Sequence, residues 1–198
     1  MKHSFLVVLL LAFMSPGNLV HAEKADRNKP MNVEADSLRY DDLKQTSVFT
    51  GRVVLTKGTI LIRGARIDVR QDSEGYQYGV VTAEPGKLAF YRQKREGLDE
   101  FIEGEGETID YDGKADRVKF VKRAELRRYR GSTLADEIVG SLITYDNSSD
   151  TFAVDGGPAS TTPGGRVRAV LSPRSPASAP AAPPAALRPS VTLEGGRK

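Results

Sequence analysis

The sequence predicts an all-β fold, a sandwich or jelly-roll-like stack of short antiparallel strands rather than an α/β arrangement. From Lys29 to Leu171, short runs of β-branched and aromatic residues alternate with polar ones, and Gly, Asp, Asn or Pro separates the runs. This texture is typical of half-buried strands joined by turns. No stretch has a convincing helical period, because the best candidate, residues 122–129, carries arginine on nearly every side.

The clearest strand is 47–56 (SVFTGRVVLT), which shows the two-residue period of a strand with two unlike faces. Phe49, Val53 and Leu55 fall on one face, and the other face is more polar and includes Arg52. We therefore expect the first face to turn inward.

The remaining strands follow in order along the chain. A turn at 57–58 leads into a strand that begins at 59–63, and Gly64 within it indicates a bulge or a close approach of two backbones. Further predicted strands are 78–82, 87–92, 107–111, 117–121, 124–129, 141–145, 151–154 and 166–171.

A Tyr-Asp pair recurs at the ends of predicted strands, as Tyr40-Asp41, Tyr111-Asp112 and Tyr145-Asp146. Each pair is followed by a turn and by a new strand with apolar residues at alternate positions. The spacing is 71 residues and then 34, so the repeat is irregular. Repeated hairpins indicate strands stacked along an axis; the alternative is that Tyr-Asp is simply a common strand ending.

The composition excludes several kinds of chemistry. The chain has 198 residues, no cysteine, and only two histidines, His3 and His21. Beyond residue 22 this excludes Ser-His-Asp and Cys-His catalysis, Cys/His zinc sites, haem ligation by these residues, and thiol redox chemistry. The net charge of +3 is uneven, with −3 over residues 23–165 and +5 over 166–198, so no folded surface for nucleic acid is indicated.

Three segments are predicted. Residues 1–22 combine a positive start, an apolar run at 5–14 and a Val20-His21-Ala22 ending, which is the pattern of a secretory signal peptide. The run of 10 residues is short beside the roughly 20 that a spanning helix needs, although an uncleaved anchor stays an alternative. Residues 23–171 would form the β-domain. The Pro/Ala-rich basic tail, 172–198, is expected to be disordered or extended.

Two charged runs have alternative interpretations. The first is a cluster of arginines that suits phosphate recognition but is more typical of an edge strand blunted by charge: Arg123, Arg127, Arg128 and Arg130. The second is an acidic run around Gly104 and Gly106, in which a flexible loop is favoured over a cation site or a catalytic carboxylate pair: Asp99, Glu100, Glu103, Glu105 and Glu107. Residues 92–97 are predicted to form a charged hairpin tip.

Strand parity assigns one continuous apolar face to the interior. Any β-sandwich has such a face and fills it with its own side chains, so parity alone favours an ordinary core over a ligand groove. The assigned residues are Phe49, Val53, Leu55, Ile60, Ile62, Leu88, Phe90, Ile109, Tyr111, Val118, Phe120, Leu126, Ile143, Tyr145, Phe152 and Val154.

The stretch 30–171 resembles the LptA family of periplasmic lipopolysaccharide-transport bridge proteins, which belongs to the OstA-like group. The most specific block is 48–62 (VFTGRVVLTKGTILI), similar to the family's F-T-G-N-V … Q-G … I-x-I signature, with Arg52 and Lys57 where Asn and Gln are usual. Residues 30–36, 86–91, 143–145 and 166–171 are similar to other elements. The family's second glycine-valine block is present only as 118–120, without its glycine.

The resemblance implies an open, V-shaped β-jellyroll without enzymatic activity, located in the periplasm, whose apolar trough holds the acyl chains of lipid A. No cofactor or metal is expected. The residues expected to bind lipid are Phe49, Val53, Leu55, Ile60, Ile62, Leu88, Phe90, Tyr111, Phe120 and Tyr145.

The expected partners are lipopolysaccharide, inner-membrane and outer-membrane transport components, and further copies of the chain. Open sheet ends offer unpaired backbone groups, so these proteins would join by strand pairing at the two ends of the stack. The residues expected there are Met31, Val33, Val167, Ala169 and Leu171. The alternatives are a glycan-binding module, which would lack any Trp for stacking on sugars, a structural β-assembly module, or the inner-membrane-anchored C component of the same pathway.

Overall fold

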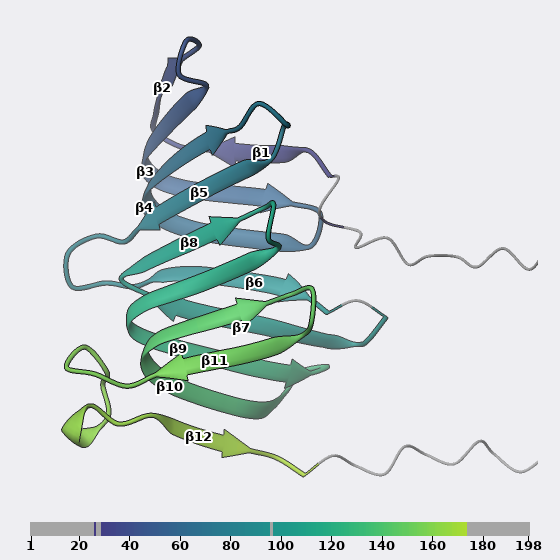
Figure 1. Ribbon diagram of the computed structural model, residues 1–198, viewed down its shortest axis with the longest axis vertical. Coiled ribbons are helices and arrows are strands. Elements are labelled where there is room, and N and C mark those ends of the chain that lie inside the picture. Colours follow the sequence, from purple (N-terminus) through teal and green to yellow (C-terminus); the bar gives the residue numbers. More distant parts are fainter. Residues whose placement is uncertain (1–25, 27–28, 96, 174–198) are drawn as a thin grey trace, which may run out of the picture.

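The computed structural model describes residues 26, 29–95 and 97–173, and within them it confirms the predicted all-β fold (Figure 1). The one helical element of this part of the chain is the short 3-10 turn η1, Pro163–Gly165. The strands are β1 (Met31–Glu34), β2 (Ser37–Asp41), β3 (Thr46–Lys57), β4 (Ile60–Gln71), β5 (Gln77–Thr82), β6 (Ala89–Lys94), β7 (Glu100–Gly106), β8 (Thr108–Asp112), β9 (Arg117–Arg130), β10 (Thr133–Asp146), β11 (Thr151–Asp155) and β12 (Arg168–Leu171).

The predicted signal peptide and all but two residues of the predicted tail lie outside the described residues. The described part of the chain contains no helix whose length and apolar character would let it cross a bilayer.

Four long strands, β3, β4, β9 and β10, each take part in two sheet layers. The first half of β3 pairs with β2 and its second half with β1, and β9 likewise pairs first with β8 and then with β7. One layer therefore runs β2-β3-β4-β5-β8-β9-β10-β11, and is called the β5–β8 layer. The other runs β1-β3-β4-β6-β7-β9-β10-β12, and is called the β6–β7 layer.

The long strands bend along one edge of the stack, which we call the spine. In β3 the bend falls at Arg52, with φ 45°, and in β9 at Lys122 and Arg123, with φ 59° and 48°. The bend of β4 lies at Gly64, where a β-carbon would stand 2.5 Å from a methyl carbon of Val81. A β-carbon there would also stand 3.1 Å from the carbonyl oxygen of Thr82, so the close backbone approach predicted at Gly64 is confirmed, and a side chain at this position would require its neighbours to shift.

The turns on the opposite edge define the mouth of the stack. Here the recurring Tyr-Asp pairs have a common structural role, because each aspartate accepts backbone N–H groups of the turn that follows it. Asp41 accepts from Lys44 at 3.1 Å, and Asp146 accepts from Ser148 and Ser149 at 3.0 Å. The mouth consists of turns 42–45, 72–76, 113–116 and 147–150 on the β5–β8 layer, and of the segments 58–59, 95 with 97–99, and 131–132 on the β6–β7 layer.

The first two and the last two strands form the two ends of the stack. β1 and β2 pair only with β3, and β11 and β12 pair only with β10, among the strands described. Figure 1 shows these pairs at the top and at the bottom of the molecule. The opening and final strands thus lie at opposite ends, as predicted, but β12 begins at Arg168, so Val167 precedes the strand instead of lying within it.

Both interpretations favoured for the charged runs are wrong. Three of the five acidic residues, Glu100, Glu103 and Glu105, lie in strand β7 instead of a flexible loop. The arginine cluster lies in β9, which is a central strand paired with β7, β8 and β10. Both runs can form central strands because β7 and β9 are neighbours and their opposite charges pair. Arg130 pairs with Glu100 at 3.3 Å, and Arg127 pairs with Glu105 at 3.0 Å. Opposite charges on facing strands stabilise their pairing.

Candidate functional site

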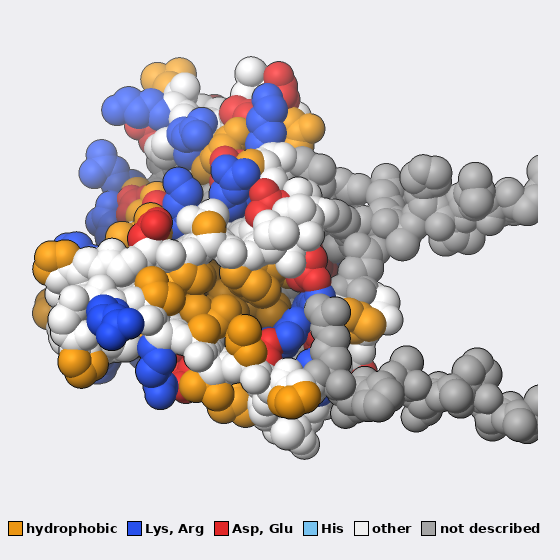
Figure 2. All heavy atoms as spheres, turned by 60° about the horizontal axis from the view of Figure 1, so that its bottom comes forward, with side chains coloured by type: hydrophobic (Ala, Val, Ile, Leu, Met, Phe, Trp, Pro, Cys, Tyr) orange, Lys and Arg blue, Asp and Glu red, His pale blue; other side chains and the backbone are white. Residues whose placement is uncertain are grey.

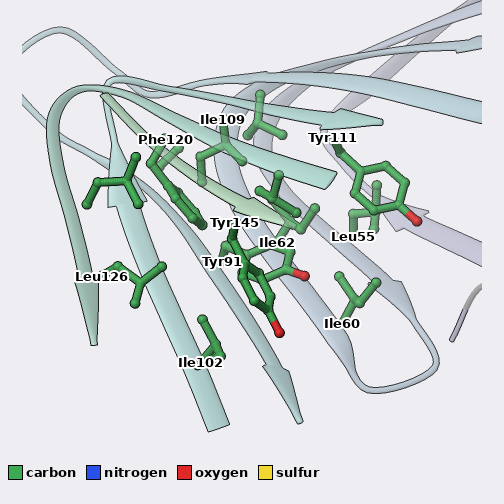
Figure 3. Packing of buried hydrophobic residues seen from close by; sticks show 14 of the residues in the cluster. Leu55, Ile60, Ile62, Tyr91, Ile102, Ile109, Tyr111, Phe120, Leu126 and Tyr145 are labelled. Carbon is green, nitrogen blue, oxygen red and sulfur yellow. The ribbon is translucent and has the colours of Figure 1, made fainter. Parts of the chain in front are cut away.

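The space between the two layers is lined by apolar side chains from both (Figure 3). Alternation along each strand sends every second residue inward, so the linings meet face to face. The β6–β7 layer contributes Val53, Leu55, Ile60, Ile62, Tyr91, Ile102 and Leu126, and the β5–β8 layer contributes Ile67, Val81, Ile109, Tyr111, Val118, Phe120, Ile143 and Tyr145.

Most residues assigned to this interior from the sequence lie there, although their role in binding stays a prediction. Phe49 is partly buried against the cluster, as are Phe152 and Val154. Fully inside are Val53, Leu55, Ile60, Ile62, Ile109, Tyr111, Val118, Phe120, Leu126, Ile143 and Tyr145.

The inward positions predicted for Leu88 and Phe90 are wrong. Strand β6 begins at Ala89, and its buried side chains are those of Ala89, Tyr91 and Gln93. Phe90 faces outward, where the guanidinium of Arg63 lies 5.6 Å from its ring centroid. Leu88 lies in the loop before the strand and is only partly buried. The stretch 88–91 is apolar throughout, so alternation could not decide which face turns inward.

The middle of the interior is filled by its own aromatic side chains. The Tyr91 ring of one layer meets the Phe120 ring of the other edge to face, with centroids 5.7 Å apart. Tyr145 stacks on Phe152 at 4.8 Å. A long apolar ligand that occupied this central region would have to displace these aromatic contacts.

The ends of the interior are more open. Leu38 and Tyr40 of β2 are 59% and 56% exposed, and Leu171 of β12 is 67% exposed. Figure 2 looks toward the β11 and β12 end and shows apolar side chains gathered in a hollow between the layers, with charged side chains at its border. The apolar lining is therefore continuous from the filled centre to the surface.

A polar network closes the mouth near the β1 end. The carboxylate of Asp26 is buried and accepts hydrogen bonds from Thr59 N–H at 2.7 Å and from the Gln93 amide at 3.2 Å. Gln93 in turn accepts from the Tyr91 hydroxyl at 2.5 Å, and burial raises the pKa of Tyr91 well above its usual value. The ammonium of Lys57, from the β6–β7 layer, donates to Gln77 of the other layer at 3.1 Å.

An ion pair spans the mouth nearer the β12 end. Arg95, in the β6–β7 turn, pairs with Glu100 on its own layer and with Asp150 on the opposite layer. Asp150 also accepts a hydrogen bond from the Tyr145 hydroxyl at 3.3 Å. Burial raises the pKa of Tyr145 to about 12. We call the Arg95–Asp150 pair the mouth clasp, because it joins the two layers on the side away from the spine.

Two further arginines face the interior, which the sequence analysis did not foresee. Register places Arg128 in line with Ile102 and Asp136, on the face of β9 that carries Leu126. Arg128 pairs with Asp136, and Arg130, two residues on, pairs with Glu100 at 3.3 Å. The inward-outward alternation of side chains along β9, continued from the buried Leu126, would have predicted that both arginines face inward. The intervening Arg127 points to the outer face, where it pairs with Glu105 and Glu125.

No cluster of three or more acidic or histidine side chains in the described residues is arranged to hold a metal ion. The arginines at the mouth are instead paired with carboxylates: Arg95 with Glu100 and Asp150, Arg128 with Asp136, and Arg130 with Glu100.

The chain is similar to known proteins over most of its described length. The family described as "LptA/(LptD N-terminal domain) LPS transport protein" matches residues 32–151. The lipopolysaccharide export system protein LptH of Pseudomonas aeruginosa is 32% identical over 154 residues, which cover 76% of this chain and 83% of that protein. LptA of Haemophilus influenzae is 29% identical, with 78% and 84% covered.

A solved structure agrees with these matches. The crystal structure of LptH, described as the LptA homologous periplasmic component of the conserved lipopolysaccharide transport device from Pseudomonas aeruginosa, superposes with a TM-score of 0.65 at 27% identity. The superposition covers 75% of this chain and 99% of that one.

Proposed function

The chain belongs to the LptA/LptD N-terminal family of lipopolysaccharide transport proteins, and from this we propose that it carries lipopolysaccharide through the periplasm with the acyl chains of lipid A held between its two layers. The proposed role is that of a non-enzymatic bridge between inner-membrane and outer-membrane components.

The continuous apolar interior is the observation that supports this proposal. Its central lining is apolar apart from tyrosine hydroxyls and the polar groups at the mouth, and its ends expose further apolar side chains. Burial of acyl chains contributes about 0.8 kcal/mol per CH₂ and needs no fixed geometry. Such a lining can therefore hold several acyl chains of variable position strongly.

The two dissimilar ends of the stack support a bridging role. β1 offers Met31 and Val33, and β12 offers Ala169 and Leu171 at the opposite end, with Val167 just before the strand. Because one end differs from the other, joining them is heterologous and need not close into a ring. Chains of copies and docking to two different partners both follow from this arrangement.

Photo-crosslinking tests the proposal with two adjacent residues of one strand. A photoreactive phenylalanine analogue at Tyr91, which faces inward, should capture lipopolysaccharide, and the same analogue at Phe90, which faces outward, should not. Tyr111 and Val48 provide a second pair of inward and outward positions. Equal labelling at both members of each pair, or no labelling at all, would contradict lipid carriage and would favour a structural assembly module.

A further inference from the structure

The inward arginines of the β6–β7 layer lie beside the apolar lining and close to the mouth. Arg128 is in register with the buried Ile102 and lies two residues along β9 from Leu126. Arg95 comes directly after β6, two residues beyond the inward Gln93. A ligand whose acyl chains lay between the layers would therefore present its polar group to this row of arginines.

Arg128 has a hydrogen-bonding group to spare. Its side chain is only 16% exposed, and its partner Asp136 is 6% exposed. Within the described residues, the Nε–H of Arg128 is the buried side-chain group that lacks a hydrogen-bond partner. An unmade hydrogen bond on a buried charged group is unfavourable, and such exceptions call for an explanation. An acceptor supplied by a ligand would satisfy this group.

Arg95 has one firmly placed partner and one that a ligand could replace. Its guanidinium pairs with Glu100, which is 17% exposed, and with Asp150, which is 41% exposed. Asp150 lies in a turn with φ 54°. An anion that entered the mouth could take the place of this carboxylate, and Glu100 would stay paired with both Arg95 and Arg130.

Arginine is suited to phosphate because its planar guanidinium donates two parallel hydrogen bonds to a pair of oxygens. The three arginines are balanced by Glu100, Asp136 and Asp150, so displacement of Asp150 leaves one positive charge uncompensated. A phosphate group would supply both the negative charge and the acceptor that Arg128 lacks.

We propose that Arg95, Arg128 and Arg130 form a subsite for the phosphate group of an acylated ligand, which replaces the carboxylate of Asp150 on Arg95 and accepts the Nε–H of Arg128. This subsite rests on the proposed function, since the acyl chains place the phosphate in the row of arginines. Binding of the phosphate also opens the mouth clasp, because the phosphate takes the place of Asp150 on the Arg95 guanidinium.

The test compares two forms of one lipid. Equilibrium binding of fluorescently labelled diphosphoryl lipid A, and of the same lipid with both phosphates removed, is measured on the full chain and on two variants. Arg95→Gln keeps Glu100 paired with Arg130, and Arg128→Gln with Asp136→Asn leaves no buried unpaired carboxylate. Each variant should bind diphosphoryl lipid A about tenfold more weakly than the parent chain and should bind the dephosphorylated lipid with unchanged affinity.

Arg127→Gln is the matched control, since Arg127 is next to Arg128 in sequence but pairs with Glu105 and Glu125 on the outer face. This substitution should leave the affinity for both lipids unchanged. Equal affinity of the parent chain for both lipids, or equal loss of both in the variants, would overturn the subsite alone. Failure of the parent chain to bind either lipid would overturn the proposed function itself. Displacement of lipid A by millimolar inorganic phosphate would show a site for free phosphate instead of a lipid headgroup.

Discussion

The ring of Phe120, from the β5–β8 layer, lies directly against the backbone of Gly104 in the other layer, so that a β-carbon at Gly104 would overlap the ring atoms. The two layers approach each other through this contact, and the Tyr91 ring packs beside it. The glycine is thus required by packing and not by its backbone angles.

Replacing Gly104 with alanine should lower the free energy of unfolding by about 1–3 kcal/mol through overpacking. Gly79→Ala is the matched control, because a β-carbon there would meet its nearest atom at 3.9 Å in a strand of the same kind. Denaturant unfolding measures both. The addition of Phe120→Leu to Gly104→Ala should recover part of the loss, and similar stability of the two alanine variants would contradict the steric account.

Fixing the mouth clasp in place should prevent lipid loading. Cysteines at positions 95 and 150 would be the only ones in the chain, so a short bis-maleimide can join the two layers at one defined point. Before cross-linking, lipopolysaccharide uptake by the double-cysteine variant should match that of Arg95→Cys alone, and after cross-linking it should be strongly reduced. Single-cysteine variants treated with the same reagent serve as controls, and undiminished uptake by the cross-linked protein would mean that the layers need not separate there.

Proline substitutions at two adjacent residues of β12 should have different effects on stability and on end-to-end association. The N–H of Ser172 donates to the carbonyl of Ala135, and antiparallel ladders alternate, so Val170 donates to β10 and Ala169 points its N–H away from the sheet. Ala169→Pro should therefore keep stability and abolish end-to-end association, whereas Val170→Pro should detach the strand. Light scattering and thermal unfolding measure these effects, and unchanged association of Ala169→Pro would exclude β12 as the interface.

Alkaline pH should destabilise the protein partly through Tyr145. Its pKa is raised by burial to about 12, whereas in the unfolded chain it is about 10. The folded state then holds the proton more tightly, so this stabilisation, about 3 kcal/mol, is complete below pH 10 and is lost as pH rises towards 12. Tyr145→Phe should show a shallower decline of unfolding free energy over this interval than the parent chain. Parallel declines would contradict the assignment.

The sequence was informative wherever one face of a strand was clearly apolar. The alternation around Val53 and Leu55 predicted both the strand and its inward face, and the Tyr-Asp pairs predicted the turns. The four long strands were less predictable, because Arg123 lies at the bend of β9 and divides one strand into two apparent ones. A bend of this kind depends on contacts between distant segments, which a local pattern does not contain.

Strand β7 was missed because its inward residues are Ile102, Gly104 and Gly106, two of which have no side chain. The space beside Gly104 is filled by the ring of Phe120 from another strand, so β7 itself does not show the alternating apolar residues that predict a strand. The inward arginines were missed for a related reason. A dense basic run resembles a solvated strand, and the carboxylate that pairs with the buried Arg128 belongs to Asp136 on the next strand, so the pair is evident only once the register of β9 and β10 is known.

The bends of the four long strands at the spine have a mechanical consequence. Because these strands continue from one layer into the other, the layers can swing apart about the line of bends while their ladders stay intact. Opening the mouth would then break side-chain contacts and the Lys57–Gln77 and Arg95–Asp150 pairs, but no interstrand backbone hydrogen bond. Amide hydrogens in the middle of β9 and β10 should accordingly stay protected from exchange with solvent while cargo enters and leaves, so that loading proceeds by hinge motion without local unfolding.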